Sequence, residues 1–207
     1  MKFLRILTVV IFAIGSTSSF AFIDAQLFVG KRSGTGKSLK LDGSDSKVDG
    51  TEIAVAGHLD PIPLVPIAFG LSLSTNTLEL EKDSYFKDLK GLNAGLEVMA
   101  WVPFLGDFKP YGKLGYIVYG KYIGEGSVTV LNTTTDYKGL YDYNGSYLSI
   151  GLGYSPLPLI SIFLEYNMTM SAKVKATEFT VDGQKQGTAG SEDFNTTAIL
   201  VGAGVGI

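Results

Sequence analysis

Apolar residues alternate with small or polar residues along several stretches of this chain, and this alternation limits the fold more than any other feature. Ile67, Phe69 and Leu71 are apolar, whereas the residues between them are alanine and glycine. Successive side chains of a β-strand point to opposite faces, so a period of two indicates a strand with one apolar face. The pattern recurs in four further stretches: 93–102, 148–155, 160–171 and 196–207. None of these apolar faces carries Lys, Arg, Asp or Glu, so each can be buried or face lipid.

Three stretches with less regular alternation, 23–31, 52–59 and 111–122, bring the number of predicted strands to eight. Short connections that contain proline alternate with long polar connections. The short ones are 60–66, 103–109 and 156–159, and the long ones are 33–50, 76–88, 123–145 and 173–193. Alternation of short and long loops places them at opposite ends of an up-and-down meander. The sequence therefore predicts an all-β fold, an eight-stranded antiparallel up-and-down β-barrel.

The chemistry of the two strand faces separates a membrane barrel from a soluble one. A soluble barrel such as a lipocalin directs its apolar face inward and has a charged outer face. Here the faces opposite the apolar ones are rich in Gly, Ser, Ala and Thr, which suit the narrow interior of eight strands. The uncharged apolar faces then suit lipid. A transmembrane barrel is favoured, and a soluble barrel is the alternative.

The first residues have the pattern of a secretory signal peptide. Lys2 and Arg5 are basic, and the apolar run Ile6–Ile14 follows. This run is far shorter than the roughly 20 residues that a transmembrane helix needs. Small residues precede a predicted cleavage after Ala21. We therefore expect a cleaved signal peptide at 1–21 and a barrel domain at 22–207.

Aromatic residues near the predicted strand ends are candidates for the aromatic girdles of a membrane barrel. Trp101, Tyr111 and Tyr154 lie near the short turns, and Tyr119 and Tyr122 lie near the long loops. We expect these five side chains to contact the membrane interface, although ordinary core packing is the alternative.

These features together resemble the small outer-membrane β-barrel proteins, in particular the membrane domain of outer membrane protein A and the outer membrane protein X and W groups. The resemblance covers the whole predicted barrel and rests on pattern rather than on a motif. It implies a bacterial outer membrane, with short turns in the periplasm and long loops outside the cell. It also implies contact with outer-membrane lipid and lipopolysaccharide, and insertion by the barrel-assembly machinery. Such barrels commonly end in Phe, whereas this chain ends in Ile207, so recognition by that machinery is in question.

Four charged residues fall on the predicted inner faces: Glu52, Glu97, Lys113 and Glu165. A charge in a packed lumen needs a partner. If the 103–109 turn sets Trp101 opposite Tyr111, Glu97 and Lys113 become diagonal neighbours and can pair. The pair is either a gate or selectivity lining, or a structural plug, and a plug is favoured because eight strands leave little room for a water path. His58, the only histidine, is expected on the inner face as a hydrogen-bonded residue without a catalytic role.

The stretch GKRSGTGKS, residues 30–38, nearly matches a phosphate-binding loop. With Gly36, Lys37 and Ser38 fixed in that motif, its first glycine belongs at position 31, which is Lys31. No helix is predicted after it, so nucleotide binding is not expected. The formal charge of −3 argues against nucleic-acid binding, and the chain has no Cys for disulfides.

The sequence favours a non-enzymatic membrane protein with a structural, envelope-integrity or surface-interaction role, and no cofactor or metal site is expected. One alternative is a narrow channel or carrier for small or hydrophobic solutes, as in the outer membrane protein W group. The second is a lipid-modifying barrel enzyme, which needs a Ser/His or Asp/Glu constellation at the rim, and the sequence shows none.

Overall fold

A computed structural model of the protein describes residues 23–206 except 38, 40–42, 62–64, 83, 104–105, 132, 158 and 187–190. The signal segment predicted at 1–21 and the terminal residue Ile207 lie outside the described residues. The strands are β1 (Ile23–Gly36), β2 (Ser46–Leu59), β3 (Ile67–Leu80), β4 (Asp88–Trp101), β5 (Phe108–Val130), β6 (Thr133–Leu157), β7 (Ile160–Val181), β8 (Gln184–Gln186) and β9 (Ser191–Gly206). No helix in this described part of the chain is long and apolar enough to cross a membrane.

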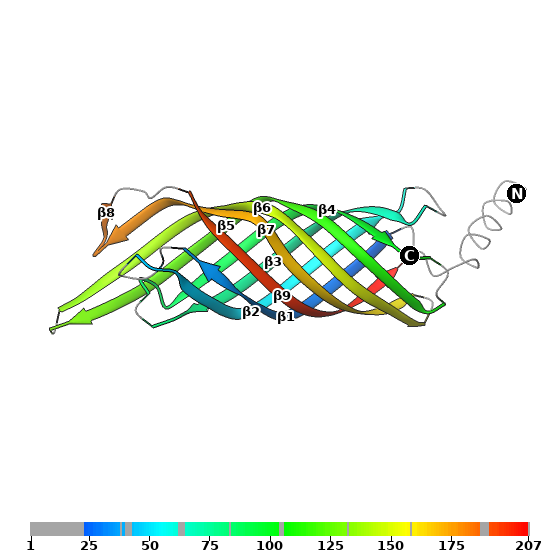
Figure 1. Ribbon diagram of the computed structural model, residues 1–207, viewed down its shortest axis with the longest axis horizontal. Helices are drawn as coiled ribbons and strands as arrows, with labels where there is room; N and C mark the ends of the chain where they lie inside the picture. The colour runs from blue at the N-terminus through cyan, green and yellow to red at the C-terminus, as the bar shows by residue number, and fades with distance from the viewer. Residues whose placement is uncertain are drawn as a thin grey trace, which may run out of the picture.

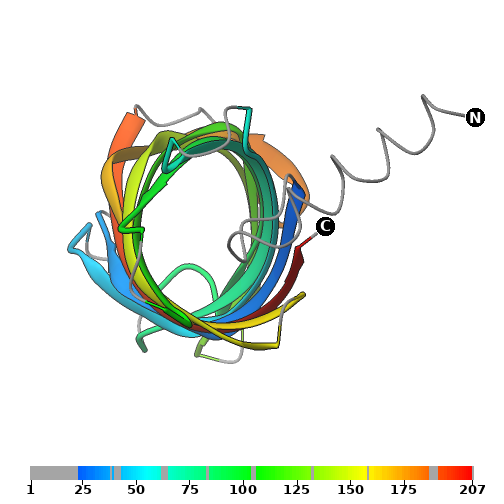
Figure 2. The same ribbon diagram turned by 90° about the vertical axis from the view of Figure 1, so that its right-hand side faces the viewer.

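The strands close into a barrel, as the alternation predicts. Consecutive long strands pair antiparallel from β1 to β7, β7 pairs with β9, and β9 pairs with β1. The short β8 pairs with β7 alone, so the closed ring contains eight strands (Figures 1 and 2). The predicted eight-stranded antiparallel fold is confirmed.

Burial alternates along the strands and shows which face is which. The side chains on the outer face are exposed, although most of them are apolar and uncharged. We call them the apolar belt, and one member from each ring strand is Val29, Ile53, Leu71, Leu96, Leu114, Ile150, Leu164 and Val201. Leu71 is 64% exposed, whereas its neighbour Gly70 and the other inward positions face the interior. Exposure of this continuous apolar surface to water costs free energy, whereas its contact with lipid does not.

The two ends of the barrel differ. At one end, which we call the proline end, the connections 60–66, 102–107 and 158–159 are short. At the other, the hairpin end, β5 and β6 continue well past the belt as strands of 23 and 25 residues (Figure 1). Two of the four long polar connections predicted from the sequence, 123–145 and 173–193, are therefore mostly strand, and the other two are about half strand.

The reason for this error is that the strand extensions contain irregularities and that their apolar side chains, such as Tyr122, Val174 and Phe194, face the interior, which is the reverse of the belt. The β5–β6 register shifts between Ile117 and Lys121, and the β7–β9 register shifts between Met168 and Lys173. Each shift reverses the order of inward and outward positions, so no single period of two runs through it.

The phosphate-loop-like stretch belongs to a strand as far as Gly36. A Cβ atom built on Gly30 would lie 1.9 Å from the backbone oxygen of Ile199, and one on Gly34 would lie 2.5 Å from that of Asn195. These glycines allow β1 to approach β9 closely. Packing explains them, and the described residues that follow, 37, 39 and 43–45, do not have the helical conformation that a phosphate loop requires.

Large and small residues face each other across neighbouring strands inside the barrel. Tyr111 is paired with Gly151, and Tyr147 is paired with Gly115. A Cβ on Gly115 would lie 2.1 Å from Cζ of Tyr147, and one on Gly151 would lie 2.3 Å from Cζ of Tyr111. Each ring therefore lies across the strand beside it, which is how a narrow interior accepts large side chains.

Candidate functional site

The inward positions of four strands bring the predicted charged residues together in the lumen. Glu52, Glu97, Lys113 and Glu165 are only 3–5% exposed. The predicted register is also observed, since Trp101 is paired with Tyr111 and Glu97 with Gly115. The positions of these side chains therefore follow directly from the alternation and the turn.

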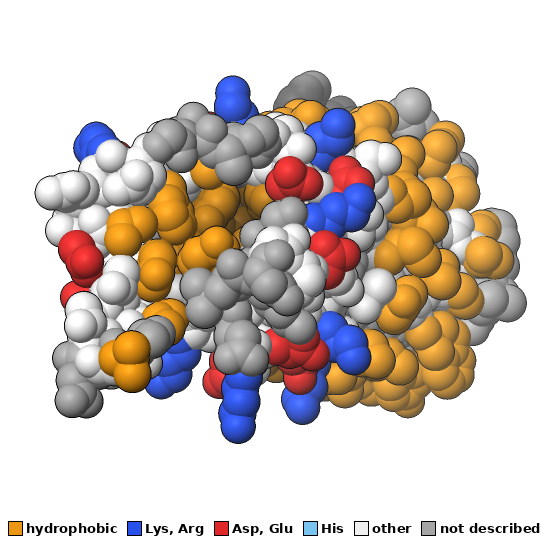
Figure 3. Space-filling view, turned by 60° about the vertical axis from the view of Figure 1, so that its left-hand side comes forward, with side chains coloured by type: hydrophobic (Ala, Val, Ile, Leu, Met, Phe, Trp, Pro, Cys, Tyr) orange, Lys and Arg blue, Asp and Glu red, His pale blue; other side chains and the backbone are white. Residues whose placement is uncertain are grey.

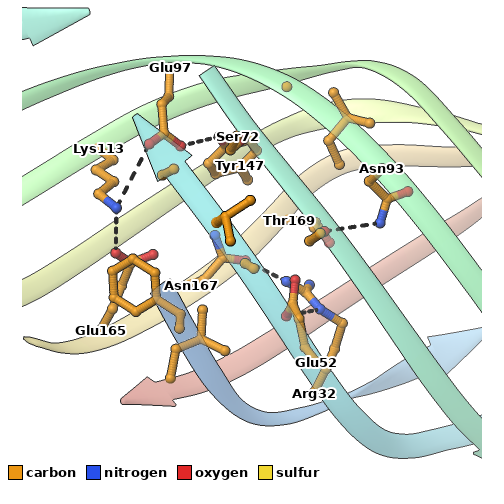
Figure 4. A pocket seen from close by; sticks show the side chains of 18 of the residues that line it. Arg32, Glu52, Ser72, Asn93, Glu97, Lys113, Tyr147, Glu165, Asn167 and Thr169 are labelled. Carbon is orange, nitrogen blue, oxygen red and sulfur yellow. Dashed lines mark hydrogen bonds and ion pairs between the residues drawn. The ribbon is translucent and has the colours of Figure 1, made fainter. Parts of the chain in front are cut away.

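Lys113 lies between two carboxylates. Its Nζ is 2.9 Å from Oε2 of Glu165 and 3.8 Å from Oε1 of Glu97 (Figure 4). It also donates a hydrogen bond of 3.0 Å to Oε1 of Gln26. The Glu97–Lys113 contact expected from the sequence is present, and Glu165 is the nearer partner.

His58 reaches Glu97 across an intervening strand. Gly70 of β3 lies between them, paired with His58 on one side and with Glu97 on the other. A Cβ on Gly70 would lie 2.5 Å from Cδ2 of His58, so glycine leaves the space through which the imidazole passes. Nε2 of His58 is 2.6 Å from Oε1 of Glu97. The expected inward position of His58 is thus observed, and its partner is a carboxylate.

Two tyrosines complete this first group of charges. The hydroxyl of Tyr147 donates to Oε2 of Glu97 and lies 3.0 Å from Oγ of Ser72. The hydroxyl of Tyr111 donates to Oε2 of Glu165 over 3.0 Å. Buried carboxylates need several donors to offset lost hydration, and these hydroxyls supply them. We call the group formed by His58, Glu97, Lys113, Glu165, Tyr111 and Tyr147 the Lys113 cluster.

A second group, the Arg32 cluster, lies nearer the hairpin end. Nε of Arg32 donates to Oε2 of Glu52 over 2.7 Å. Its Nη1 donates to Thr196 over 2.6 Å, and its Nη2 donates to Oδ1 of Asn167 over 3.0 Å. Asn167 in turn donates to Oγ of Ser149 over 2.9 Å. A guanidinium thus connects four consecutive strands of the wall, β2, β1, β9 and β7, from the lumen side.

The sequence prediction missed Arg32 because it ended the first strand at Lys31. The signal was present, since Gln26, Phe28 and Gly30 alternate inward and Arg32 continues the series. The partners of Arg32 in β7 and β9 are separated from it by 135 and 164 positions, so sequence proximity gave no indication of them.

The two clusters enclose a small cavity and are flanked by apolar groups. The cavity is about 60 Å³ and is lined by Arg32, Glu52, Glu97 and Lys113, among others (Figure 4). Since one water needs about 10–15 Å³ of such space, it has room for a few waters. Apolar side chains, most of them aromatic, pack on both sides. Phe28, Met99, Trp101, Tyr111 and Phe163 lie toward the proline end, and Tyr122, Tyr143 and Phe194 lie toward the hairpin end.

Three of the five aromatics predicted for the membrane interface point into the lumen instead. Trp101, Tyr111 and Tyr122 are 7%, 4% and 1% exposed. Trp101 lies under the ammonium group of Lys109, 4.3 Å from the ring centroid. The girdle interpretation was wrong for Tyr111 and Tyr122 because Gly151 and Gly91 leave room for their rings inside. It was wrong for Trp101 because this residue continues the inward series of Glu97 and Met99. Tyr119 and Tyr154 are 50% and 40% exposed and do lie on the outer face.

The arrangement can hold the barrel wall together and fill its interior. Glu52, Glu97 and Glu165 each have a cation or hydroxyl donor within reach, so these buried charges are compensated. Among the residues that the structure describes, no group of three or more His, Asp or Glu side chains has a metal-binding arrangement.

The closed ring with its outward apolar belt defines the class of protein, a barrel of the type that crosses membranes with strands. Comparisons with models of protein families and with curated sequences give no match. Solved structures do match. This chain is similar to the outer membrane protein OprG from Pseudomonas aeruginosa, at 15% identity and a TM-score of 0.56, covering 91% of this chain and 97% of that one.

Two further structures are similar over nearly their whole length. Neisserial surface protein A has 12% identity and a TM-score of 0.54, covering 92% of this chain and 98% of its own. The outer membrane protein AlkL, determined in lipid bilayers, has 11% identity and a TM-score of 0.54, covering 93% of both chains. At these identities the likeness shows a shared fold, which is the small outer-membrane β-barrel fold that the sequence resembles.

Proposed function

We propose that this chain is a non-enzymatic integral protein of a bacterial outer membrane, with a structural or surface-interaction role and a lumen that does not conduct. In this proposal residues 1–21 are removed on export, and the barrel-assembly machinery inserts the mature chain. The proline end faces the periplasm and the hairpin end faces outward, where long strand extensions are available to partners. The apolar belt and the shared fold support the membrane location.

One observation carries the closed lumen: the Lys113 cluster and the Arg32 cluster span the interior and leave only about 60 Å³ between them. Aromatic side chains fill the lumen on both sides of this cavity. A solute would have to separate buried ion pairs and displace packed rings to pass. Both steps are costly. Removing one partner of a buried ion pair by mutation destabilises a protein by about 3–5 kcal/mol, and separating the pair leaves the same uncompensated charge.

Planar-bilayer recording of the refolded mature protein tests this proposal. A folded barrel is first verified by its heat-shifted mobility on a gel. The wild-type protein is expected to give no reproducible conductance steps. The matched variant Lys113→Ala removes the cation between Glu97 and Glu165 and is expected to give steps if the cluster closes the lumen. Reproducible steps from the verified wild-type barrel would refute the closed lumen and favour a narrow channel.

A hollow at the hairpin end favours binding of a hydrophobic or aromatic solute as a second candidate function. The hollow has a volume of about 710 Å³, and Tyr137 is the aromatic residue of its lining, which otherwise is mostly polar and includes Lys87, Glu125, Asp136 and Lys138. Tyr137 packs against Tyr85 and Phe179, with ring centroids 5.5 and 6.3 Å apart. Figure 3 shows apolar side chains within this concave end. Tyr137→Ala is expected to abolish any saturable binding of a fluorescent aromatic probe, and a wild-type barrel without such binding would exclude this function.

A further inference from the structure

His58 lies inside the barrel toward the proline end and is the only histidine of the chain. Its side chain is 1% exposed. An imidazole is the side chain whose ordinary ionisation falls between about pH 5 and 8, so its charge at neutral pH is set by its surroundings. The charges around His58 therefore indicate which form the folded barrel holds.

Glu97 is in direct contact with the imidazole. Nε2 of His58 lies 2.6 Å from Oε1 of Glu97, and the side chain of Glu97 is 3% exposed. The ammonium group of Lys113 is farther from Glu97, at 3.8 Å, and its nearer carboxylate is Glu165, at 2.9 Å (Figure 4). One lysine thus serves two buried carboxylates, and His58 is closer to Glu97 than that lysine is.

Carboxylates outnumber ammonium groups around His58. Asp24 of β1 is its cross-strand partner, and Asp24, Asp60 and Lys109 line a cavity of about 10 Å³ together with it. The inward residues of β3 beside it, Ala68 and Gly70, carry no charge, and the hydroxyls of Tyr111 and Tyr147 donate to the carboxylates. Among the described residues, the charged groups around His58 are Asp24, Asp60, Glu97 and Glu165 against Lys109 and Lys113. Four carboxylates against two ammonium groups leave two negative charges in excess.

A proton on His58 offsets part of this excess. Burial by itself disfavours a charged histidine, because it removes the water around the charge, whereas an opposite charge within about 4–6 Å favours it. Here the carboxylate of Glu97 is in contact. With the proton, the Lys113 cluster has two cations, His58 and Lys113, for its two carboxylates. Without it, two buried carboxylates share one lysine, and a buried charge that lacks its partner is strongly destabilising.

We propose that His58 is protonated in the folded barrel at neutral pH and that this proton holds the Lys113 cluster together, so that alkali loosens the barrel. In water an imidazole releases its proton near about pH 6.5. The unfolded chain has therefore largely lost this proton at neutral pH, whereas the folded barrel keeps it. The contribution of His58 to stability is complete in mild acid and is lost as the pH rises. This sensitivity to pH goes beyond the proposed structural role and does not depend on it.

Nitrogen NMR of the refolded mature barrel, made without a histidine tag and with isotope-labelled histidine, measures the protonation of His58 directly. The chain has one histidine, so the spectrum contains one imidazole ring. A protonated imidazole carries hydrogen on both ring nitrogens, and a neutral one carries it on one. Both nitrogens are expected to carry hydrogen at neutral pH. Glu97→Gln, verified as folded by heat-shifted gel mobility, is expected to release the proton at lower pH. A neutral ring in the wild type at neutral pH, or release at the same pH in both proteins, would overturn the proposal.

Urea unfolding over the range in which an imidazole titrates measures the coupled stability. Because unfolding releases one proton, the unfolding equilibrium constant of the wild type is expected to rise by up to about tenfold per pH unit above about pH 6.5. His58→Gln has no such proton and is expected to change little over this range. An equal pH dependence of the two proteins would overturn the proposal, and the NMR measurement decides the protonation state even if His58→Gln does not fold. Conductance of the wild type tests the closed lumen separately, so failure of that proposal is distinguishable from failure of this one.

Discussion

Replacing Arg32 by methionine is expected to destabilise the barrel by about 3–5 kcal/mol, the usual cost of removing one partner of a buried ion pair. The value follows from the surroundings of Glu52, which is 3% exposed and whose carboxylate receives its 2.7 Å hydrogen bond from Arg32. Arg32 also donates to Thr196 and Asn167, so the substitution leaves two further buried acceptors without this donor. Hydrogen bonds to charged groups contribute about 1.5–3 kcal/mol each. The contributions of the three hydrogen bonds of Arg32 do not simply add, so the ion-pair figure is the better guide to the total loss of stability.

Urea unfolding of the lipid-reconstituted protein measures this loss. Trp101 is the only tryptophan and lies inside the barrel, so its fluorescence reports on the lumen. Arg32→Met/Glu52→Met removes both charges and is expected to recover most of the loss, since apolar groups can replace a buried pair. Lys138→Ala is the control, because Lys138 and Glu125 are 63% and 58% exposed and exposed pairs contribute at most about 1 kcal/mol. A loss below about 1 kcal/mol for Arg32→Met, or no recovery in the double variant, would refute this reasoning.

Two further predictions concern the interior. Gly115→Ala is expected to displace Tyr147 from Glu97 and to lower the free energy of unfolding in urea by about 1–3 kcal/mol. Gly57→Ala is the control, because its added methyl group meets open space. Equal stability of the two variants would contradict the packing of Tyr147 against Gly115. Brominated lipid is expected to quench the fluorescence of Trp101 weakly, because its ring lies in the lumen. In Trp101→Phe/Tyr119→Trp the quenching is expected to be strong, because position 119 is 50% exposed on the outer wall. The opposite order would place Trp101 at the lipid interface.

The belt and the Lys113 cluster could be predicted because they depend on period and on one turn. Alternation assigns Leu71 to lipid and Glu97 to the lumen, and the 103–109 turn sets the register that brings Glu97 to Lys113. The strand extensions at the hairpin end could not be predicted. Their apolar side chains face the interior, opposite to those of the belt, and bulges such as that between Ile117 and Lys121 break the period.

Lumen contacts between strands that are not neighbours in sequence could not be predicted for a different reason. Arg32 contacts Asn167 and Thr196 because the sheet closes and because its strands are staggered. The local residue pattern predicts neither the closure nor the stagger. The His58–Glu97 contact required knowing that Gly70 lies between them. The girdle prediction was wrong for Trp101 because its position near a strand end was given more weight than its inward phase, whereas Tyr119 and Tyr154 do lie on the outer face.

The pairing of β1 with β9 has a consequence for how the chain reaches its native state. Asp24 and Gly206 are partners, so the ring closes only when the first and last strands meet. Until then both strands have an unpaired edge, and such edges recruit other chains into aggregates. The β5–β6 and β6–β7 hairpins join neighbours in sequence and can form quickly, whereas the closing ladder depends on slow long-range contacts. The unpaired edges of β1 and β9 therefore have to be shielded until the ring closes. Pairing of these two strands, late in folding, removes both edges together.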